Sequence, residues 1–258
     1  MTEVITQTIH RVMHEIKRRR LQVLRAVDLT PRMRRITVGG PELAGFISLG
    51  TDDHVKLLFP QNAEEQAALE TLELGANSEQ GPKPAMRDYT PRRYDLDTLE
   101  LDIDFVLHGD GPASTWAAQA QPGQFLHIAG PRGSMVVPDI FDSYLLIGDE
   151  TALPAIARRL EGLAANRRAL VVVEIENGAE QQVLDSPAEV EVIWVLREGG
   201  KDHLLTTVQQ LVLPQGQLYA WIATEAKASR QIRRVLLDDK GLDQQFVKAV
   251  GYWQLDPH

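Results

Sequence analysis

RDYTPR, at residues 87–92, is the stretch around which the rest of the chain is organised. Side chains alternate across an extended strand, so Arg87 and Tyr89 are expected on one face and Thr90 on the other, unless Pro91 bends the chain. An arginine can make a bidentate contact to a phosphate, a tyrosine ring can stack, and a threonine hydroxyl can bond the edge of a heterocycle. The stretch therefore predicts either a grip on a flat, phosphate-bearing ligand or an ordinary edge strand with a solvated arginine.

The first half of the chain has the pattern of a small antiparallel barrel. Short segments rich in β-forming residues follow one another, with turn signals between them. An excursion over residues 61–86, first helix-prone and then rich in glycine and proline, has a length that suggests it frames a site. Six strands with almost no helix predict a six-stranded antiparallel β-barrel. In residues 99–107 the apolar Leu101, Ile103, Phe105 and Leu107 alternate with Asp102 and Asp104, as expected of an antiparallel strand with one apolar face. The expected strands are residues 21–27, 34–38, 54–60, the strand that opens with 87–92, 99–107 and 124–129.

One helix is expected to interrupt the barrel, at residues 115–120, after the turn HGDGPAS at residues 108–114. Glycines permit a tight turn, and Pro112 suits a first helical position. The free N–H groups and the dipole of a helix N-terminus together favour a phosphate. The turn therefore predicts a phosphate site or a plain capped helix.

The pattern changes after Pro138. A continuous apolar run, YLLIG at residues 144–148, is typical of a strand that is covered on both faces. Further strands at 169–175, 190–196, 218–223 and 246–252 alternate with helices at 153–165, 204–212 and 226–237. This order predicts an α/β doubly wound parallel sheet with ligands beyond the carboxyl ends of its strands. Two domains are expected, residues 1–138 and 139–258.

The turn after the first parallel strand, GDETALP at residues 148–154, occupies the position of a nucleotide phosphate loop. It lacks the usual glycine-rich fingerprint, because Gly148 is its single glycine and two acids follow. Its position indicates a place where a nicotinamide could meet a group held by the barrel.

Composition excludes several classes of function. The 258 residues carry a formal net charge of −9, which disfavours nucleic acid or an anionic membrane surface as a partner. The absence of cysteine excludes disulfides, iron–sulfur clusters and thiolate zinc sites, and it fits a cytoplasmic protein. No signal peptide or membrane-spanning run is predicted. The basic run KRRR, at residues 17–20, is interpreted as a solvated entry to the first strand rather than a binding patch.

The motifs together resemble the siderophore-interacting proteins, a family of flavin-dependent ferric-siderophore reductases within the ferredoxin-reductase-like flavoproteins. The resemblance extends over nearly the whole chain. It rests on residues 53–60, 87–92, 108–117, 130–134 and 148–156 and on the closing GYW at 251–253. It implies a barrel that binds FAD and a second domain that receives NADPH or NADH, from which electrons pass to Fe(III) in a siderophore.

The resemblance also implies roles for individual residues. Arg87 would contact the flavin phosphates, Tyr89 would pack on the isoalloxazine, Thr90 would bond near its reactive edge, and Arg92 belongs to the same set without a firm task. The residues expected along the pyrophosphate and ribose are His108, Gly111, Pro112, Ala113 and Ser114. Thr151 and Ala152 would approach the flavin from the nicotinamide side. Lys56 and Arg132 would attract an anionic ferric chelate.

Two alternatives stay open, because the loop at 148–154 departs from the glycine-rich loop of the wider superfamily. A ferredoxin-type protein could replace the pyridine nucleotide as electron donor, or the chain could bind flavin or siderophore without turnover.

The remaining polar and aromatic residues are given structural roles. Scattered histidines predict no metal site. Arg230, Arg233 and Arg234 share one helix face, which is interpreted as solvated in preference to phosphate-binding. Trp194 and Trp221 are expected in the core, and Tyr252 and Trp253 either pack or shield a ring.

Overall fold

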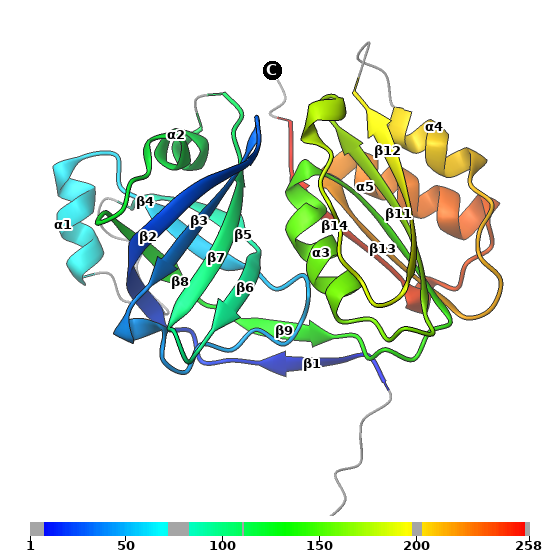
Figure 1. Ribbon diagram of the computed structural model, residues 1–258, viewed down its shortest axis with the longest axis horizontal. Coiled ribbons are helices and arrows are strands. Elements are labelled where there is room, and N and C mark those ends of the chain that lie inside the picture. The colour runs from blue at the N-terminus through cyan, green and yellow to red at the C-terminus, as the bar shows by residue number, and fades with distance from the viewer. Residues whose placement is uncertain (1–7, 72–82, 110, 198–202, 256–258) are drawn as a thin grey trace, which may run out of the picture. The chain divides into compact units, whose positions relative to one another are not determined.

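A computed structural model describes residues 8–71, 83–109, 111–197 and 203–255. Contacts divide the chain into two compact units, Met1–Pro138 and Asp139–His258. Figure 1 shows that each unit has its own main sheet. Each unit also has its own apolar core. No helix within the described ranges is long and apolar enough to cross a membrane.

The N-terminal unit is built on an antiparallel sheet that curves into a half-barrel (Figure 1). The sheet has the strand order β5-β4-β8-β2-β3-β7-β6. Its strands are β2 (Arg18–Thr30), β3 (Met33–Gly39), β4 (Val55–Phe59), β5 (Ala85–Tyr89), β6 (Pro91–Asp95), β7 (Glu100–Val106) and β8 (Phe125–Ala129). A separate two-stranded ribbon joins β1 (His10–Met13) to β9 (Gly133–Val136).

The sheet has seven strands where six were expected, because the stretch at residues 87–92 is two strands and not one. β5 ends at Tyr89 and pairs with β4, whereas β6 begins at Pro91 and pairs with β7. A proline has no N–H to donate, so the ladder on one side of the stretch cannot continue through it. β5 and β6 are therefore the two opposite edges of the sheet, and Thr90 lies where the chain passes from one edge to the other.

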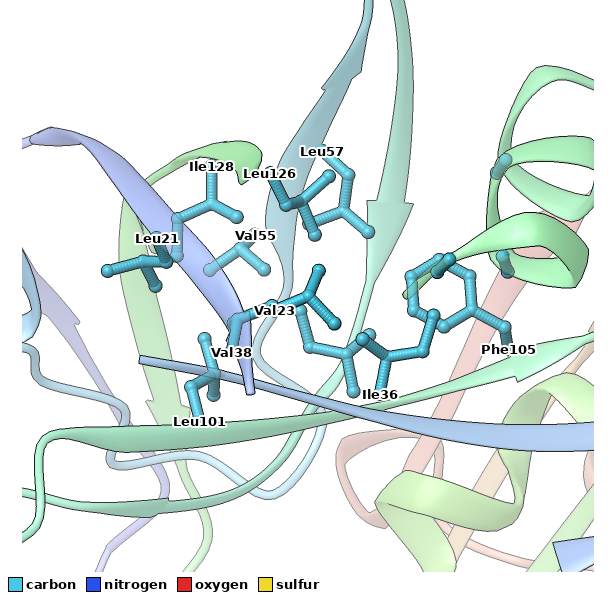
Figure 2. Packing of buried hydrophobic residues seen from close by; sticks show 14 of the residues in the cluster. Leu21, Val23, Ile36, Val38, Val55, Leu57, Leu101, Phe105, Leu126 and Ile128 are labelled. Atoms are coloured by element: carbon cyan, nitrogen blue, oxygen red, sulfur yellow. The ribbon is translucent and has the colours of Figure 1, made fainter. Parts of the chain in front are cut away.

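The barrel core comes from alternate positions of the central strands, as Figure 2 shows. Leu101, Ile103 and Phe105 of β7 are fully buried, which confirms the expected inward face of that strand. The acids between them are buried too, because each has a partner on β3. Asp102 accepts from Thr37 Oγ1 at 2.5 Å, and Asp104 accepts from Arg35 Nε at 2.7 Å.

Two helices accompany the half-barrel. α1 (Ala63–Thr71) follows β4, and residues 72–82 of the same excursion lie outside the described part of the chain. α2 (Pro112–Gln119) packs on β3, β4 and β7 and inserts Ala113 and Ala117 into the core. A short 3₁₀ turn, η1 (Pro41–Leu43), follows β3.

The C-terminal unit holds a five-stranded parallel sheet in the order β12-β11-β10-β13-β14. α4 and α5 share a core with Leu145 and Ile147, and α3 covers the other face of the sheet (Figure 1). The strands are β10 (Ser143–Asp149), β11 (Arg168–Ile175), β12 (Glu189–Leu196), β13 (Leu218–Glu225) and β14 (Val247–Trp253). The helices are α3 (Leu153–Glu161), α4 (His203–Gln210) and α5 (Ala226–Arg234), with a π-helical segment η4 (Val235–Asp239) and 3₁₀ turns η2 (Glu150–Ala152), η3 (Gly178–Glu180) and η5 (Gln244–Phe246).

Candidate functional site

The chain passes from β5 to β6 at Thr90, and residues 87–92 around this point are called the seam. The seam carries Tyr89 and Thr90 of the opening stretch. Tyr89 pairs with Val55 of β4, and its ring centroid lies 4.5 Å from that of Phe105, so the core fixes its ring. Burial raises the pKa of the Tyr89 hydroxyl, and the charge of Arg87 opposes this only in part. The phenol therefore stays neutral at physiological pH. Thr90 is 6 % exposed, and its hydroxyl makes no hydrogen bond with any group in the described ranges.

The arginines of the seam differ in exposure. Arg87 pairs with Leu57, whose side chain is in the core, so Arg87 and Tyr89 share a face of β5, as the alternation predicted. The Arg87 side chain is exposed, and its Nη1 donates to the carbonyl of Met86 at 2.9 Å. Arg92 is half-buried in β6. The guanidinium of Arg87 is thus available to an anion at the edge of the sheet.

The turn before α2 is closed by Ser114. Gly111 is the N-cap, and no side chain caps the helix. The backbone N–H of His108 donates to Ser114 Oγ at 2.9 Å, so this buried hydroxyl holds the turn in place. The first-turn N–H groups of Ala113 and Ser114 have no intrahelical acceptor. Asp110, in the same turn, lies outside the described residues.

A cavity of about 800 Å³ lies in the N-terminal unit beside the start of α2. Pro112 and Trp116 of α2 line it together with Phe59 of β4 and His127 of β8. At its rim the guanidinium of Arg20 lies 3.5 Å from the ring centroid of Phe125. No sequence pattern signalled this cavity, because its lining comes from helices and strands far apart in the chain.

The two residues expected to attract an anionic chelate are exposed. Lys56 Nζ pairs with Asp88 Oδ1 at 2.8 Å, with about half of each side chain exposed. Arg132 is exposed just before β9, and its carbonyl accepts from the backbone N–H of His14. A carboxylate therefore offsets the charge of Lys56, which sequence reasoning missed.

In the C-terminal unit the turn after β10 is organised by Asp149, which is 1 % exposed. Asp149 Oδ1 accepts from the N–H of Thr151 at 2.9 Å and from its hydroxyl. Asp149 Oδ2 accepts from Thr224 Oγ1 at 2.8 Å and Trp253 Nε1 at 2.7 Å. Burial raises the pKa of Asp149, and these hydrogen bonds oppose that rise only in part. Thr151 is fixed by this carboxylate, and Ala152 is fully buried beside it.

The second acid of the turn, Glu150, is also turned into the protein. Its carboxylate accepts hydrogen bonds from Nη1 and Nη2 of Arg197, at 3.1 and 2.7 Å, and from the backbone N–H of Glu176 at 2.7 Å. Arg197 pairs further with Glu174 and Glu176. Burial alone would lower the pKa of Arg197, and the hydrogen bonds and charges of Glu150 and Glu174 more than reverse this, so its pKa is raised. The sequence pattern had not singled out Arg197.

The basic run, the tryptophans and the arginines of α5 differ in how far they are buried. The basic run is not simply solvated, because Arg19 is 5 % exposed. Trp221 is buried in the core as expected, and Tyr252 packs against it with ring centroids 6.0 Å apart. Trp194 is only half-buried. The arginines of α5 lie on its outer side, with 230 and 234 exposed and 233 half-buried, as a solvated face requires.

Comparison with known proteins first defines the class. The chain has a ferredoxin-reductase-like fold, with an N-terminal antiparallel half-barrel and a C-terminal parallel sheet. It shares this fold with a flavohemoglobin from Malassezia yamatoensis (14 % identity, TM-score 0.66, covering 92 % of this chain and 60 % of that one). At that identity the likeness concerns the fold alone.

The family follows from closer matches. The siderophore-interacting FAD-binding domain matches residues 22–135, and the siderophore-interacting protein domain matches residues 141–256. The chain belongs to the siderophore-interacting protein family, which confirms the resemblance seen in its motifs. It is 37 % identical over 246 residues to an NADPH-dependent ferric-chelate reductase of Escherichia coli, covering 94 % of this chain and 95 % of that protein.

Two further relatives support the assignment. A ferric vibriobactin reductase of Vibrio cholerae is 30 % identical over 241 residues, covering 92 % of this chain and 89 % of the relative. The crystal structure of a siderophore utilization protein from T. fusca superimposes with a TM-score of 0.85 at 38 % identity, covering 97 % of this chain and 98 % of that one.

The residues present fit a flavin dinucleotide. The dinucleotide needs positive charge and N–H donors for its phosphates, an aromatic surface, and a polar contact for the heterocycle. The N-terminal unit offers the exposed Arg87, the open N-terminus of α2, the fixed ring of Tyr89 and the hydroxyl of the largely buried Thr90, which no described group engages.

Proposed function

We propose that this protein is an FAD-dependent ferric-siderophore reductase that takes electrons from NADPH, delivers them to Fe(III) in the chelate and so releases Fe(II). The observation that carries the proposal is the seam at Thr90, where an arginine, a fixed aromatic ring and a free hydroxyl gather between the two sheet edges of a siderophore-interacting protein. The names of its relatives, a ferric-chelate reductase and a ferric vibriobactin reductase, agree with this reaction.

FAD, when bound, supplies the conversion of a two-electron hydride into single electrons for iron. The protein is left with binding and orientation. Arg87 would hold the flavin phosphates, Tyr89 would cover the isoalloxazine, and Thr90 would hydrogen-bond near its reactive edge. Arg92, half-buried in β6, would complete this set.

The turn His108–Ser114 would hold the pyrophosphate and ribose. Gly111 and Pro112 start α2, and the N–H groups of Ala113 and Ser114 are the donors a phosphate needs. The cavity beside Pro112 has room for the part of the cofactor beyond its phosphates. Its aromatic lining, Phe59 and Trp116, suits an adenine ring.

The C-terminal unit would receive the electron donor. We infer a doubly wound sheet from the strand order, with β10 in the middle and helices on both faces, and such sheets bind ligands beyond their carboxyl ends. Thr151 and Ala152 stand at that edge and would approach the nicotinamide side of the flavin. In this assignment residues 1–138 bind the flavin and residues 139–258 bind the nucleotide. We propose a cytoplasmic location for the reaction.

Lys56 and Arg132 would raise the local concentration of an anionic ferric chelate against the acidic background of the chain. Replacing both with alanine should raise KM for such a chelate and leave the bound flavin unchanged. An unchanged KM would remove both residues from the substrate site.

The experiment that tests the function is an absorbance spectrum of the purified protein, followed by anaerobic titration with NADPH, then NADH, then a reduced ferredoxin. We expect a flavin spectrum that NADPH bleaches and that a ferric chelate restores, with Fe(II) trapped by a colour reagent. A colourless protein that takes up no added FAD would refute the proposal. Bleaching by reduced ferredoxin and not by a pyridine nucleotide would identify a ferredoxin-type protein as the electron donor. A bound flavin that no donor reduces would indicate a protein that binds flavin without turnover.

A further inference from the structure

A second, smaller cavity of about 200 Å³ lies in the N-terminal unit, and none of the residues assigned to flavin or chelate lines it. Its walls are fixed by backbone hydrogen bonds between two segments. The N–H of His14 donates to the carbonyl of Arg132 at 2.9 Å, and the N–H of Gly130 donates to the carbonyl of Lys17 at 3.1 Å. The β1–β9 ribbon and β2 therefore hold two of the segments that line the cavity in place.

The cavity is lined by a buried cation, Arg19. Arg19 is 5 % exposed, its Nη1 donates to the carbonyls of Gly130 and Lys17 at 3.2 and 3.3 Å, and its Cζ lies 5.3 Å from the ring centroid of Phe46. Its Nε has no hydrogen-bond partner. Within the described ranges no carboxylate comes within ion-pair distance of this guanidinium. A buried charge without a counter-ion costs free energy, so this one is poised to receive an anion.

The acid whose charge reaches Arg19 is occupied elsewhere. Glu42 Oε2 accepts from the backbone N–H of Arg20 at 2.7 Å. Burial lowers the pKa of Arg19, and the charge of Glu42 opposes this only in part. An arginine stays protonated in proteins, so its charge remains to be balanced.

The rim carries a lysine that a ligand can use. Lys17 lines the cavity with 53 % of its side chain exposed, and it pairs at 3.2 Å with the still more exposed Glu15, which lines the cavity too. Such surface pairs are weak, so a bound anion can compete for Lys17. His14 also lines the cavity, and its Nε2 is bonded to the buried Ser134 Oγ at 2.7 Å. That hydroxyl donates to Asp53 at 2.5 Å, so His14 Nε2 must be the donor in the bond to Ser134.

We propose that this cavity is a binding site for a small oxyanion, a carboxylate or phosphate group, with Arg19 as its buried charge and Lys17 at its mouth. The volume equals that of roughly half a dozen water molecules at about 30 Å³ each, which suits inorganic phosphate or a small organic acid. No residue assigned to the flavin or the chelate lines this cavity, so the proposal does not rest on the proposed function.

The test is unfolding of the full chain in phosphate, citrate or chloride at matched ionic strength, with and without saturating FAD. A ligand that binds only the folded chain shifts the unfolding equilibrium by the factor 1 + [L]/Kd, about 100-fold when its concentration is 100 times Kd. We expect a saturable stabilisation by phosphate or citrate over chloride, also with FAD present. The stronger of the two anions identifies the class of ligand. Equal unfolding in all three salts would overturn the proposal.

Variants locate the site. Arg19→Gln should abolish the difference between oxyanion and chloride, whereas Arg11→Gln, which removes the same charge from an exposed position on β1, should retain it. Lys17→Glu reverses a charge at the exposed rim and keeps the proposal testable where Arg19→Gln does not fold. We expect at least tenfold weaker phosphate binding by calorimetry for Lys17→Glu. A full wild-type response in both Arg19→Gln and Lys17→Glu would place the anion elsewhere and refute the assignment.

Discussion

Trp253→Phe should destabilise the C-terminal unit through the loss of a single hydrogen bond. Trp253 is 40 % exposed, yet its Nε1 donates at 2.7 Å to Asp149, which is 1 % exposed. Phenylalanine keeps an aromatic ring and removes the donor. At a pH above the raised pKa of Asp149 the acceptor is charged. A hydrogen bond to a charged group is worth about 1.5–3 kcal/mol, and we expect a loss of that size there.

A double-mutant cycle isolates this hydrogen bond from the rest of the ring. Asp149→Asn removes the charge and leaves one side-chain oxygen, which cannot accept from both Thr151 and Trp253 at their present positions. In the Asp149→Asn variant the further change Trp253→Phe should therefore cost much less, with a coupling free energy of about 1–3 kcal/mol. The assay is urea unfolding followed by far-ultraviolet circular dichroism. A coupling below about 0.5 kcal/mol would refute the view that Asp149 holds the indole.

The same carboxyl gives the protein a pH dependence whose sign follows from its raised pKa. The folded state binds the Asp149 proton more tightly than the unfolded chain does, because the charged form is desolvated. Its stability contribution is fully present below the ordinary aspartate pKa of about 3.9 and is lost as pH rises through the higher folded value. Asp149→Asn should remove this component from the curve of stability against pH. An identical curve for the variant would contradict the assignment.

Three further outcomes are expected. Asp88→Asn removes the carboxylate 2.8 Å from Lys56 Nζ, so KM for an anionic ferric chelate should fall about two- to fivefold with unchanged flavin content, opposite in sign to Lys56→Ala. Gly148→Ala would bring a Cβ within 2.8 Å of the carbonyl of Ala223, and urea unfolding should show a loss of about 1–3 kcal/mol. Ser114→Ala leaves the N–H that closes the turn before α2 without its partner, and thermal unfolding should show about 1–3 kcal/mol of destabilisation.

Local pattern was sufficient to predict most of the elements. The continuous apolar run at 144–148 predicted a covered strand, and β10 is buried at every position. The alternation of Leu101, Ile103 and Phe105 predicted the inward face of β7. Both signals are short-range, since the chemistry of each residue and its immediate neighbours decides them.

The errors came from partners that are distant in sequence. Asp102 belonged to the expected outward face of β7 but is buried, because Thr37, 65 residues earlier, donates to it. The turn at 148–154 likewise gave no sign of the partners of its two acids. Asp149 is bonded by Trp253, 104 residues away, and Glu150 by Arg197. A single sequence contains no measure of such pairings.

The break at Thr90 gives a physical reason for the proposed place of the flavin. The outer sides of β5 and β6 are the two edges of the sheet, and edge strands present backbone N–H and C=O groups without a strand partner. A flat heterocycle with donors and acceptors along its edge can satisfy such groups, as a further strand would. A single unbroken strand at residues 87–92 would have provided one edge and a solvated arginine. Because Pro91 divides the stretch into two strands, the two edge strands β5 and β6 follow each other directly at Thr90. The ring of Tyr89 lies beside this point and is fixed there by Phe105.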